Sequence, residues 1–279
     1  MFTINCKGKL LTLDQPRLMG ILNATPDSFY EGHLPGGTNA MVMLADTMIR
    51  EGASIIDIGG QSTRPGSPRI TADGELKRVI PVIEAIHKNN PDAILSIDTY
   101  FSAVAAAAVA AGASMVNDIS GGEMDDAMIA TVAALKVPYV CMHMKGRPEN
   151  MQHESHYDNV VTEVLDFFIR KFEQCRNVGI NDLVFDPGFG FGKTIAHNFS
   201  LLKNLSVFSI TGRPVLAGLS RKSTVYKTLG TSAGEALNGT TVLNTMALMN
   251  GASILRVHDV KAANEAILLY NAYQKAPRC

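Results

Sequence analysis

The chain has 279 residues, of which 46% are hydrophobic and 18% are charged, and its formal net charge is −1. This composition excludes the disordered class, and the near-neutral charge excludes the basic surface with which proteins bind nucleic acids or anionic membranes. We therefore expect neither a nucleic-acid partner nor a membrane partner. The length suits a single α/β barrel, a fold that runs to about 250 residues as one unit.

The cysteines and the N-terminal segment indicate a cytoplasmic protein. Cys6, Cys141, Cys175 and Cys279 form no CxxC pair, which is typical of reduced thiols rather than of disulfides or a metal site. The N-terminus has neither the basic start nor the long apolar run of a signal peptide. The alanine-rich stretch 103–111 is far shorter than the roughly 20 residues that span a bilayer.

Eight short apolar runs recur along the chain, each followed by turn residues and a helical pattern. They cover residues 18–22, 54–58, 94–97, 115–116, 138–142, 183–185, 214–217 and 253–257. Most are apolar at successive positions, which is typical of strands in a parallel sheet that is covered on both faces.

Capping residues mark the helices between these strands. The expected helix starts are Asn39, Thr71 (with Glu75 in the first turns), Ser102, Ser155 or Asp158, and Asp259. The expected helix stops are Gly52, Gly112 and Gly179.

Eight strand–helix units without a linker allow either a closed barrel or an open doubly wound sheet. An open sheet usually carries a Gly-rich turn after its first strand, whereas this strand ends in NATPD at 23–27. Polar residues also follow nearly every strand, as in barrels whose active site draws on many strand ends. The sequence thus predicts one (β/α)8 TIM-barrel domain over residues 1–279, with its site at the C-terminal ends of the strands.

Polar strand ends indicate a site for a flat heterocycle. Asp98, Asn117 and Asp186, together with Lys222, can surround a ring that has two parallel N–H donors, such as a guanine-like or pterin ring. The aspartates at the strand ends would repel one another unless a ligand or a cation balances them. The alternatives are helix caps or structural ion pairs for the aspartates, and a solvated surface position for Lys222.

The last strand ends in a candidate anion site. Arg256 and His258 are two positions apart, so both lie on the same side of the strand and can face one anion. Barrels often hold phosphate near strands seven and eight. The alternative is a surface pair of Arg256 with an aspartate, and a histidine that only satisfies a backbone group.

Three glycine-containing loops complete the candidate site. The loops 23–37 and 59–67 are long enough to be lids over the mouth. The third, 186–193, resembles a phosphate loop but lacks its GxxxxGK[ST] spacing. We interpret it as backbone that approaches a flat ligand closely, with Phe191 as an apolar wall.

Eight collinear motifs resemble the dihydropteroate synthase family of pterin-binding enzymes. They are NATPDSF (23–29), DIGGQSTRPG (57–66), SIDT (96–99), NDISGG (117–122), MHMKG (142–146), DPGFGF (186–191), SRKS (220–223) and RVHDV (256–260). Two departures are visible: YEGH at 30–33 stands where the family commonly has SDGG, and Gln61 replaces a common glutamate.

The resemblance implies a transferase that condenses 6-hydroxymethyl-7,8-dihydropterin pyrophosphate with 4-aminobenzoate in folate biosynthesis. It implies catalytic roles for Asp98, Asp186 and Lys222, which with Asn117 also hold the pterin. The implied pyrophosphate ligands are Asn23, which also contacts Mg²⁺, Arg64, Arg256 and His258. The implied aminobenzoate pocket consists of Thr63, Pro65, Phe191 and Ser220.

The same resemblance implies a homodimer, Mg²⁺ as cofactor and sulfonamides as competitors of 4-aminobenzoate. Two alternatives to this activity remain: a pterin-dependent methyltransferase on the same barrel, and a pterin-binding protein without catalysis. A methyltransferase has no need of the Arg256 and His258 pair, and intact loops argue against a non-catalytic protein.

Overall fold

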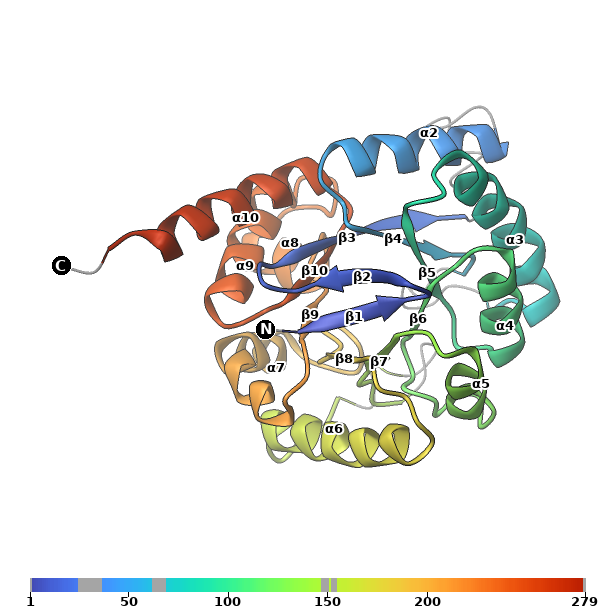
Figure 1. The fold of residues 1–279 in the computed structure, drawn as a ribbon. Helices are drawn as coiled ribbons and strands as arrows, with labels where there is room; N and C mark the ends of the chain where they lie inside the picture. Colours follow the sequence, from blue (N-terminus) through green and yellow to red (C-terminus); the bar gives the residue numbers. More distant parts are fainter. Residues whose placement is uncertain (1, 25–36, 62–68, 147–150, 152–154, 278–279) are drawn as a thin grey trace.

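A computed structural model describes residues 2–24, 37–61, 69–146, 151 and 155–277. Eight parallel strands form one sheet in the order β8-β7-β6-β5-β4-β3-β10-β9, with helices around it (Figure 1). A parallel bridge between Phe185 and Val215 joins the two edges of this sheet. The sheet therefore closes on itself, which confirms the predicted (β/α)8 barrel and excludes the open doubly wound sheet.

All eight predicted strands are present and differ from prediction only at their ends. The barrel strands are β3 (Arg17–Asn23), β4 (Ile55–Gly59), β5 (Ile94–Asp98), β6 (Met115–Asp118), β7 (Tyr139–Met142), β8 (Leu183–Asp186), β9 (Leu216–Ala217) and β10 (Ile254–Val257).

The helices follow the strands and cover the outside of the barrel (Figure 1). They are α2 (Gly37–Arg50), α3 (Ala72–Asn89), α4 (Ser102–Ala111), α5 (Met128–Leu135), α6 (Val160–Asn177), α7 (Ile195–Lys203), the 3₁₀ helix η1 (Leu205–Thr211), α8 (Ser223–Leu229), α9 (Leu237–Met249) and α10 (Val260–Lys275). No helix in the described part of the chain is both long and apolar enough to cross a membrane.

Several predicted helix ends are confirmed by their geometry. The hydroxyl of Thr71 caps α3 by accepting the backbone N–H of Gly74 at 3.1 Å. Gly52, Gly112 and Gly179 follow α2, α4 and α6 with φ values of 109°, 128° and 87°. This left-handed region is accessible mainly to glycine, so these residues end the helices as expected.

Other predicted helix starts are wrong by a few residues. Asn39 lies inside α2 and does not cap it, and Ser102 is the first residue of α4. The cap of α6 is Asn159 rather than Ser155 or Asp158, because Asn159 has an extended backbone and its side chain accepts two backbone N–H groups of the first turn. Where several polar residues precede a helix, composition alone does not choose among them.

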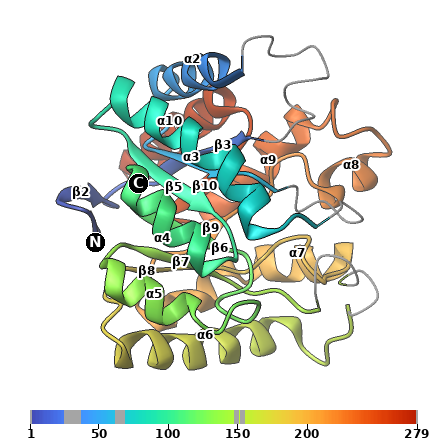
Figure 2. The ribbon, with the colours of Figure 1, turned by 90° about the vertical axis from the view of Figure 1, so that its right-hand side faces the viewer.

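An antiparallel hairpin, which the sequence reasoning missed, precedes the barrel. It consists of β1 (Thr3–Cys6) and β2 (Lys9–Thr12). Lys7 and Gly8 connect the strands with φ values of 53° and 90°, as expected for a two-residue turn with positive φ at both positions. In Figure 1 the hairpin lies across one end of the barrel, and Figure 2 shows it at the end opposite to α8.

The hairpin closes an apolar layer inside the barrel, which we call the floor. One buried side chain from each barrel strand contributes to this layer, together with four residues of the N-terminal segment. They are Met19, Ile55, Ile94, Met115, Val140, Val184, Leu216 and Ile254, with Ile4, Cys6, Leu11 and Leu13. Intervening strand residues such as Leu18, Ile56 and Leu255 pack instead with the helices, as the two-residue period of a strand requires.

Candidate active site in the barrel mouth

Two residues beyond the floor, the inward positions of the strands become mostly polar. Because side chains alternate along a strand, Asp57, Asn117, Asp186 and Arg256 follow the floor residues Ile55, Met115, Val184 and Ile254. Asp98 follows two positions beyond Ser96 on β5, and Lys222 comes from the segment between β9 and α8. We call Asp57, Asp98, Asn117, Asp186, Lys222 and Arg256 the mouth cluster.

Arg256 is the cation that balances two of the strand-end aspartates. Its Nε donates to Asp57 Oδ2 and its Nη2 to Asp98 Oδ2, each at 2.6 Å. Burial raises the pKa of the Asp98 carboxyl, whereas Arg256 opposes that rise. Burial also disfavours the charged guanidinium, but the two carboxylates outweigh it and raise the pKa of Arg256. Arg256 is thus part of a buried ion-pair network and not of the surface pair that was the alternative.

Asn117 is joined to this network through Asp57. Its Nδ2 donates to Asp57 Oδ2 at 2.9 Å, so that one carboxylate oxygen accepts from both Asn117 and Arg256. Asp98 and Asn117 are direct neighbours in the paired strands β5 and β6. Two of the predicted ring-binding residues, Asp98 and Asn117, are therefore held by Asp57 and Arg256.

Asp186 and Lys222 lie together on the other side of the mouth. Asp186 Oδ1 accepts the backbone N–H of Gly188 at 2.7 Å, and Lys222 Nζ donates to the carbonyl of Phe189 at 2.6 Å. Burial raises the pKa of Asp186, and Lys222 opposes this. Burial lowers the pKa of Lys222 to about 8, with Asp186 opposing. Lys222 is therefore not a solvated surface lysine.

Gly218, which the sequence reasoning did not single out, leaves space between these groups. A Cβ at this position would lie 3.6 Å from Lys222 Nζ and 3.9 Å from Asp186 Oδ2. A larger side chain would extend into the mouth between them. The absence of a side chain at Gly218 thus leaves space beside Lys222 and Asp186.

Two glycines of the loop 186–193, Gly188 and Gly192, lie against neighbouring backbone. A Cβ at Gly188 would lie 1.9 Å from the carbonyl oxygen of His143, and one at Gly192 would lie 2.3 Å from that of Lys145. Glycine is required at these two positions because the loop packs against the backbone that follows β7. Phe191, the predicted apolar wall, is buried, and its ring centroid lies 4.7 Å from Lys222 Nζ.

Lys193 holds the same two segments together, and the sequence reasoning missed it. Its buried Nζ lies 2.9 Å from His143 Nδ1 and donates to the carbonyls of His143, Gly188 and Phe191 at 3.0–3.2 Å. Burial lowers the pKa of Lys193 to about 7. Burial, together with the Lys193 charge, lowers the pKa of His143 well below its usual value. Lys193 therefore fixes the loop that carries Phe191.

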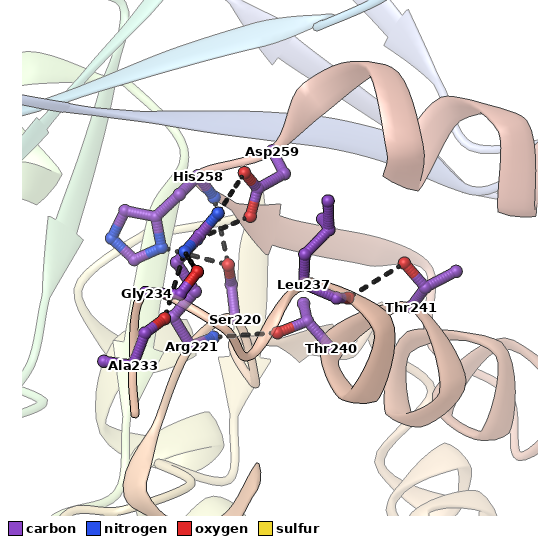
Figure 3. Close-up of polar contacts among 9 residues, drawn as sticks. All are labelled: Ser220, Arg221, Ala233, Gly234, Leu237, Thr240, Thr241, His258 and Asp259. Carbon is purple, nitrogen blue, oxygen red and sulfur yellow. Dashed lines mark hydrogen bonds and ion pairs between the residues drawn. The ribbon is translucent and has the colours of Figure 1, made fainter. Parts of the chain in front are cut away.

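Ser220 and His258 contact each other at the rim of the mouth (Figure 3). Ser220 Oγ lies 3.0 Å from His258 Nδ1 and accepts the His258 backbone N–H at 3.2 Å. Beside them, Arg221 forms a two-point ion pair with Asp259, with both N···O distances at 2.8 Å. Asp259 stands at the start of α10, but its side chain makes no capping bond there. Asp259 thus occupies the predicted N-cap position of α10, but its carboxylate pairs with Arg221 rather than with the N–H groups of the first turn.

Part of the predicted site lies outside the described residues, including Thr63, Arg64, Pro65 and the loop residues 25–36. Asn23 is described, at the exposed end of β3. Gln61, the residue that departs from the family pattern, donates to the Tyr100 hydroxyl at 2.6 Å.

Glu75 was expected only as an acidic residue in the first turns of α3. The structure instead buries its carboxylate, which accepts the Thr99 hydroxyl at 2.8 Å. Burial raises the pKa of Glu75 to about 7. This acid thus links α3 to the residue that follows Asp98.

Comparisons with known proteins agree with this geometry. The model of the pterin binding enzyme family matches residues 19–258. The chain is 40% identical to the dihydropteroate synthase of Haemophilus influenzae, over 96% of this chain and 98% of that protein. Among solved structures, Yersinia pestis dihydropteroate synthase in a sulfonamide drug complex has a TM-score of 0.93 and 40% identity, over 99% of this chain and 100% of that one.

The Xanthomonas albilineans dihydropteroate synthase solved with 4-aminobenzoic acid has a TM-score of 0.92 and 42% identity, and the match covers 99% of both chains. The similarity therefore spans the floor, the mouth and the outer helices alike.

Proposed function

The chain belongs to the dihydropteroate synthase family of pterin binding enzymes, and we propose that it condenses 6-hydroxymethyl-7,8-dihydropterin pyrophosphate with 4-aminobenzoate. The products are 7,8-dihydropteroate and pyrophosphate, which makes the chain a transferase of folate biosynthesis. The observation that carries this proposal is the mouth cluster, in which carboxylates, an amide and a half-buried lysine gather at the C-terminal ends of the strands. The full-length match to named synthases argues against a methyltransferase and against a non-catalytic protein.

The pterin ring is assigned to Asp98, Asn117, Asp186 and Lys222. A carboxylate such as Asp186 accepts two parallel N–H donors, which the amino-amidine edge of a pterin supplies. Lys222 donates to a ring oxygen or nitrogen from the opposite side. Lys222 Nζ and Asp186 Oδ2 both lie within 4 Å of the Cβ position at Gly218, which supports this assignment.

The bond that breaks joins the 6-methylene carbon to the pyrophosphate oxygen, and its electron pair leaves with pyrophosphate. Positive charge then spreads over the electron-rich ring, where Asp98 and Asp186 supply negative potential. The aromatic amine of 4-aminobenzoate forms the new C–N bond and loses a proton. Asp98, Asp186 and Lys222 are the catalytic residues in this scheme.

The leaving pyrophosphate is assigned to Asn23, Arg64, Arg256 and His258. Arg256 donates to the carboxylates through Nε and Nη2. Because a guanidinium has five N–H donors in all, other N–H groups of Arg256 remain for the pyrophosphate. His258 stands beside it at the rim. The position of Arg256 and His258 at the end of the last strand agrees with the usual phosphate site of barrels.

We propose Mg²⁺ as a cofactor that arrives with the pyrophosphate. The described residues contain no group of three or more His, Cys, Asp or Glu side chains that could hold a metal. Mg²⁺ commonly takes one or two protein oxygens and completes its shell with substrate phosphates and waters, so the amide oxygen of Asn23 fits this role. Bound there, the ion would neutralise charge on the leaving group.

The aminobenzoate pocket is assigned to Thr63, Pro65, Phe191 and Ser220. The buried Phe191 ring and the Ser220 hydroxyl lie on the loops that follow β8 and β9. The relative solved with 4-aminobenzoic acid and the one solved with a sulfonamide support this pocket and its inhibition by sulfonamides.

We propose that the chain forms a homodimer through its outer helices in the cytoplasm. Large apolar side chains are exposed on the adjacent helices α9 and α10, namely Val242, Met246, Met249, Leu268, Leu269 and Tyr273. Buried free thiols at Cys6, Cys141 and Cys175 suit a reducing compartment. Light scattering coupled to size exclusion tests the dimer, and a monomer at micromolar concentration would contradict it.

Release of pyrophosphate tests the proposed reaction. Purified protein should release pyrophosphate from dihydropterin pyrophosphate only when Mg²⁺ is present, and faster when 4-aminobenzoate is present as well. EDTA should abolish the release, and added Mg²⁺ should restore it. Release at a rate that is independent of 4-aminobenzoate, or the absence of release from a protein that binds the ring, would contradict the proposal.

A further inference from the structure

We propose that Asp57 is a positioning residue that sets the ring specificity of the mouth. It holds the Asn117 amide so that the amide oxygen, and not the nitrogen, is offered to the bound heterocycle. The inference rests on the proposed pterin site and adds to it a residue that has no ligand contact of its own.

The geometry around Asp57 carries the inference. Asp57 lies on β4, its side chain is fully buried, and its Oδ2 accepts both from Asn117 Nδ2 at 2.9 Å and from Arg256 Nε at 2.6 Å. An ionised carboxylate accepts hydrogen bonds and cannot donate them. The charged Arg256 on the same oxygen keeps the carboxylate in this place.

This arrangement leaves Asn117 a single favourable orientation. With the amide turned over, its oxygen would face Asp57 Oδ2 with no proton between them, and Asp57 Oδ2 would keep only the bond from Arg256. The nitrogen therefore stays on Asp57, and the oxygen becomes the group presented to a ligand. Arg256 also positions Asp98, because its Nη2 donates to Asp98 Oδ2.

The mouth therefore offers hydrogen-bond acceptors to a bound heterocycle. The carboxylates of Asp98 and Asp186 and the oxygen of Asn117 all require N–H donors. A pterin has a 2-amino group on the edge that such acceptors recognise, whereas the corresponding lumazine has a 2-oxo group that would meet oxygen atoms. Sites built to pair a donor reject the analogue that lacks it, because the buried acceptors stay unpaired.

Binding of 6-hydroxymethylpterin and of 6-hydroxymethyllumazine to three proteins tests the proposal. The wild type should prefer the pterin strongly. Asp57→Leu, which has a similar shape but no acceptor, should lower the ratio of the two affinities by about tenfold, since Asn117 is then free to turn. Asp57→Asn retains one oxygen for Asn117 and Arg256 and should keep most of the preference.

An unchanged ratio in folded Asp57→Leu would overturn the role of Asp57 while leaving the proposed function intact. A wild type without any preference for the pterin would instead contradict the proposed pterin site itself. Neutron diffraction on the wild type bound to 6-hydroxymethylpterin gives an answer that needs no variant. The amide deuterons of Asn117 should face Asp57, and deuterons directed at the ring alone would overturn the proposal.

Discussion

The floor and the mouth are adjacent layers of the same barrel, only two residues apart on several strands, and they differ in almost every property. The floor consists of apolar side chains, one from each barrel strand, under a hairpin. In the mouth cluster, burial raises the pKa of Asp98 and Asp186 and lowers the pKa of Lys222. The alternation of a strand thus separates a layer that stabilises the fold from a layer that binds ligands.

The difference also shows where stability is given up for function. Each fully buried aliphatic side chain of the floor stabilises the fold by roughly 1.5–3 kcal/mol. In the mouth, burial of charged groups costs free energy, which ion pairs such as Arg256 with Asp57 and Asp98 only partly offset. We therefore expect substitutions in the two layers to have different effects on stability and binding.

The largest effect is expected for Arg256→Ala, which leaves two buried carboxylates without their cation. The free energy of unfolding should fall by about 3–5 kcal/mol, measured by urea denaturation at pH 7.5. Arg17→Ala is the control, because its ion pair with Asp14 is partly exposed and should contribute less than about 1 kcal/mol. Equal losses in both variants would contradict a buried network in the mouth.

Asp186→Asn should act on binding rather than on the floor. Loss of the charge that faces the ring donors should weaken 6-hydroxymethylpterin binding by about 1.5–3 kcal/mol, the size of a hydrogen bond to a charged group. Isothermal calorimetry measures this directly. Unchanged affinity in a folded variant would remove Asp186 from the ring site.

Ile254→Val tests the floor with a smaller change on the strand that carries Arg256. Removing one buried methylene should lower the free energy of unfolding by about 0.5–1.5 kcal/mol, with ring affinity unaltered. Thermal denaturation and calorimetry on the same sample give both values. A loss of ring affinity would show that the two layers are coupled.

The smallest effect is a change in the pH dependence of stability at Glu75, in the first turn of α3. Its pKa is about 7 in the folded protein and 4.5 in a model compound. The unfolded chain releases the proton first, so this group lowers stability as the pH rises from about 4.5 to about 7. Glu75→Gln should therefore show a shallower fall in melting temperature over this range. Glu84→Gln, an exposed change on the same helix, should keep the wild-type slope.

Local pattern was enough to predict the barrel and the gathering of polar residues at the C-terminal ends of its strands. The strands at 18–22 and 54–58 are apolar runs, and Gly112 and Gly179 end helices through their own backbone freedom. The gathering of Asp98, Asn117 and Asp186 follows from parallel strands ending at one edge.

Partners that lie far apart in the sequence could not be predicted in the same way. Arg256 and Asp57 are 199 residues apart, and no local pattern indicates that their strands place them together. The contacts of Lys193 and the backbone packing at Gly188 depend on how two loops meet. The hairpin at Lys7 and Gly8 was missed because two short strands give a weak periodic signal.

A crystal structure of the protein with 6-hydroxymethylpterin, pyrophosphate and Mg²⁺ tests the central claim most directly. The pterin should lie in the mouth, with its N–H donors within hydrogen-bond distance of Asp98, Asn117 and Asp186 and with Lys222 on its opposite side. The pyrophosphate should lie near Arg256 and His258. A pterin bound outside the mouth cluster would contradict the account.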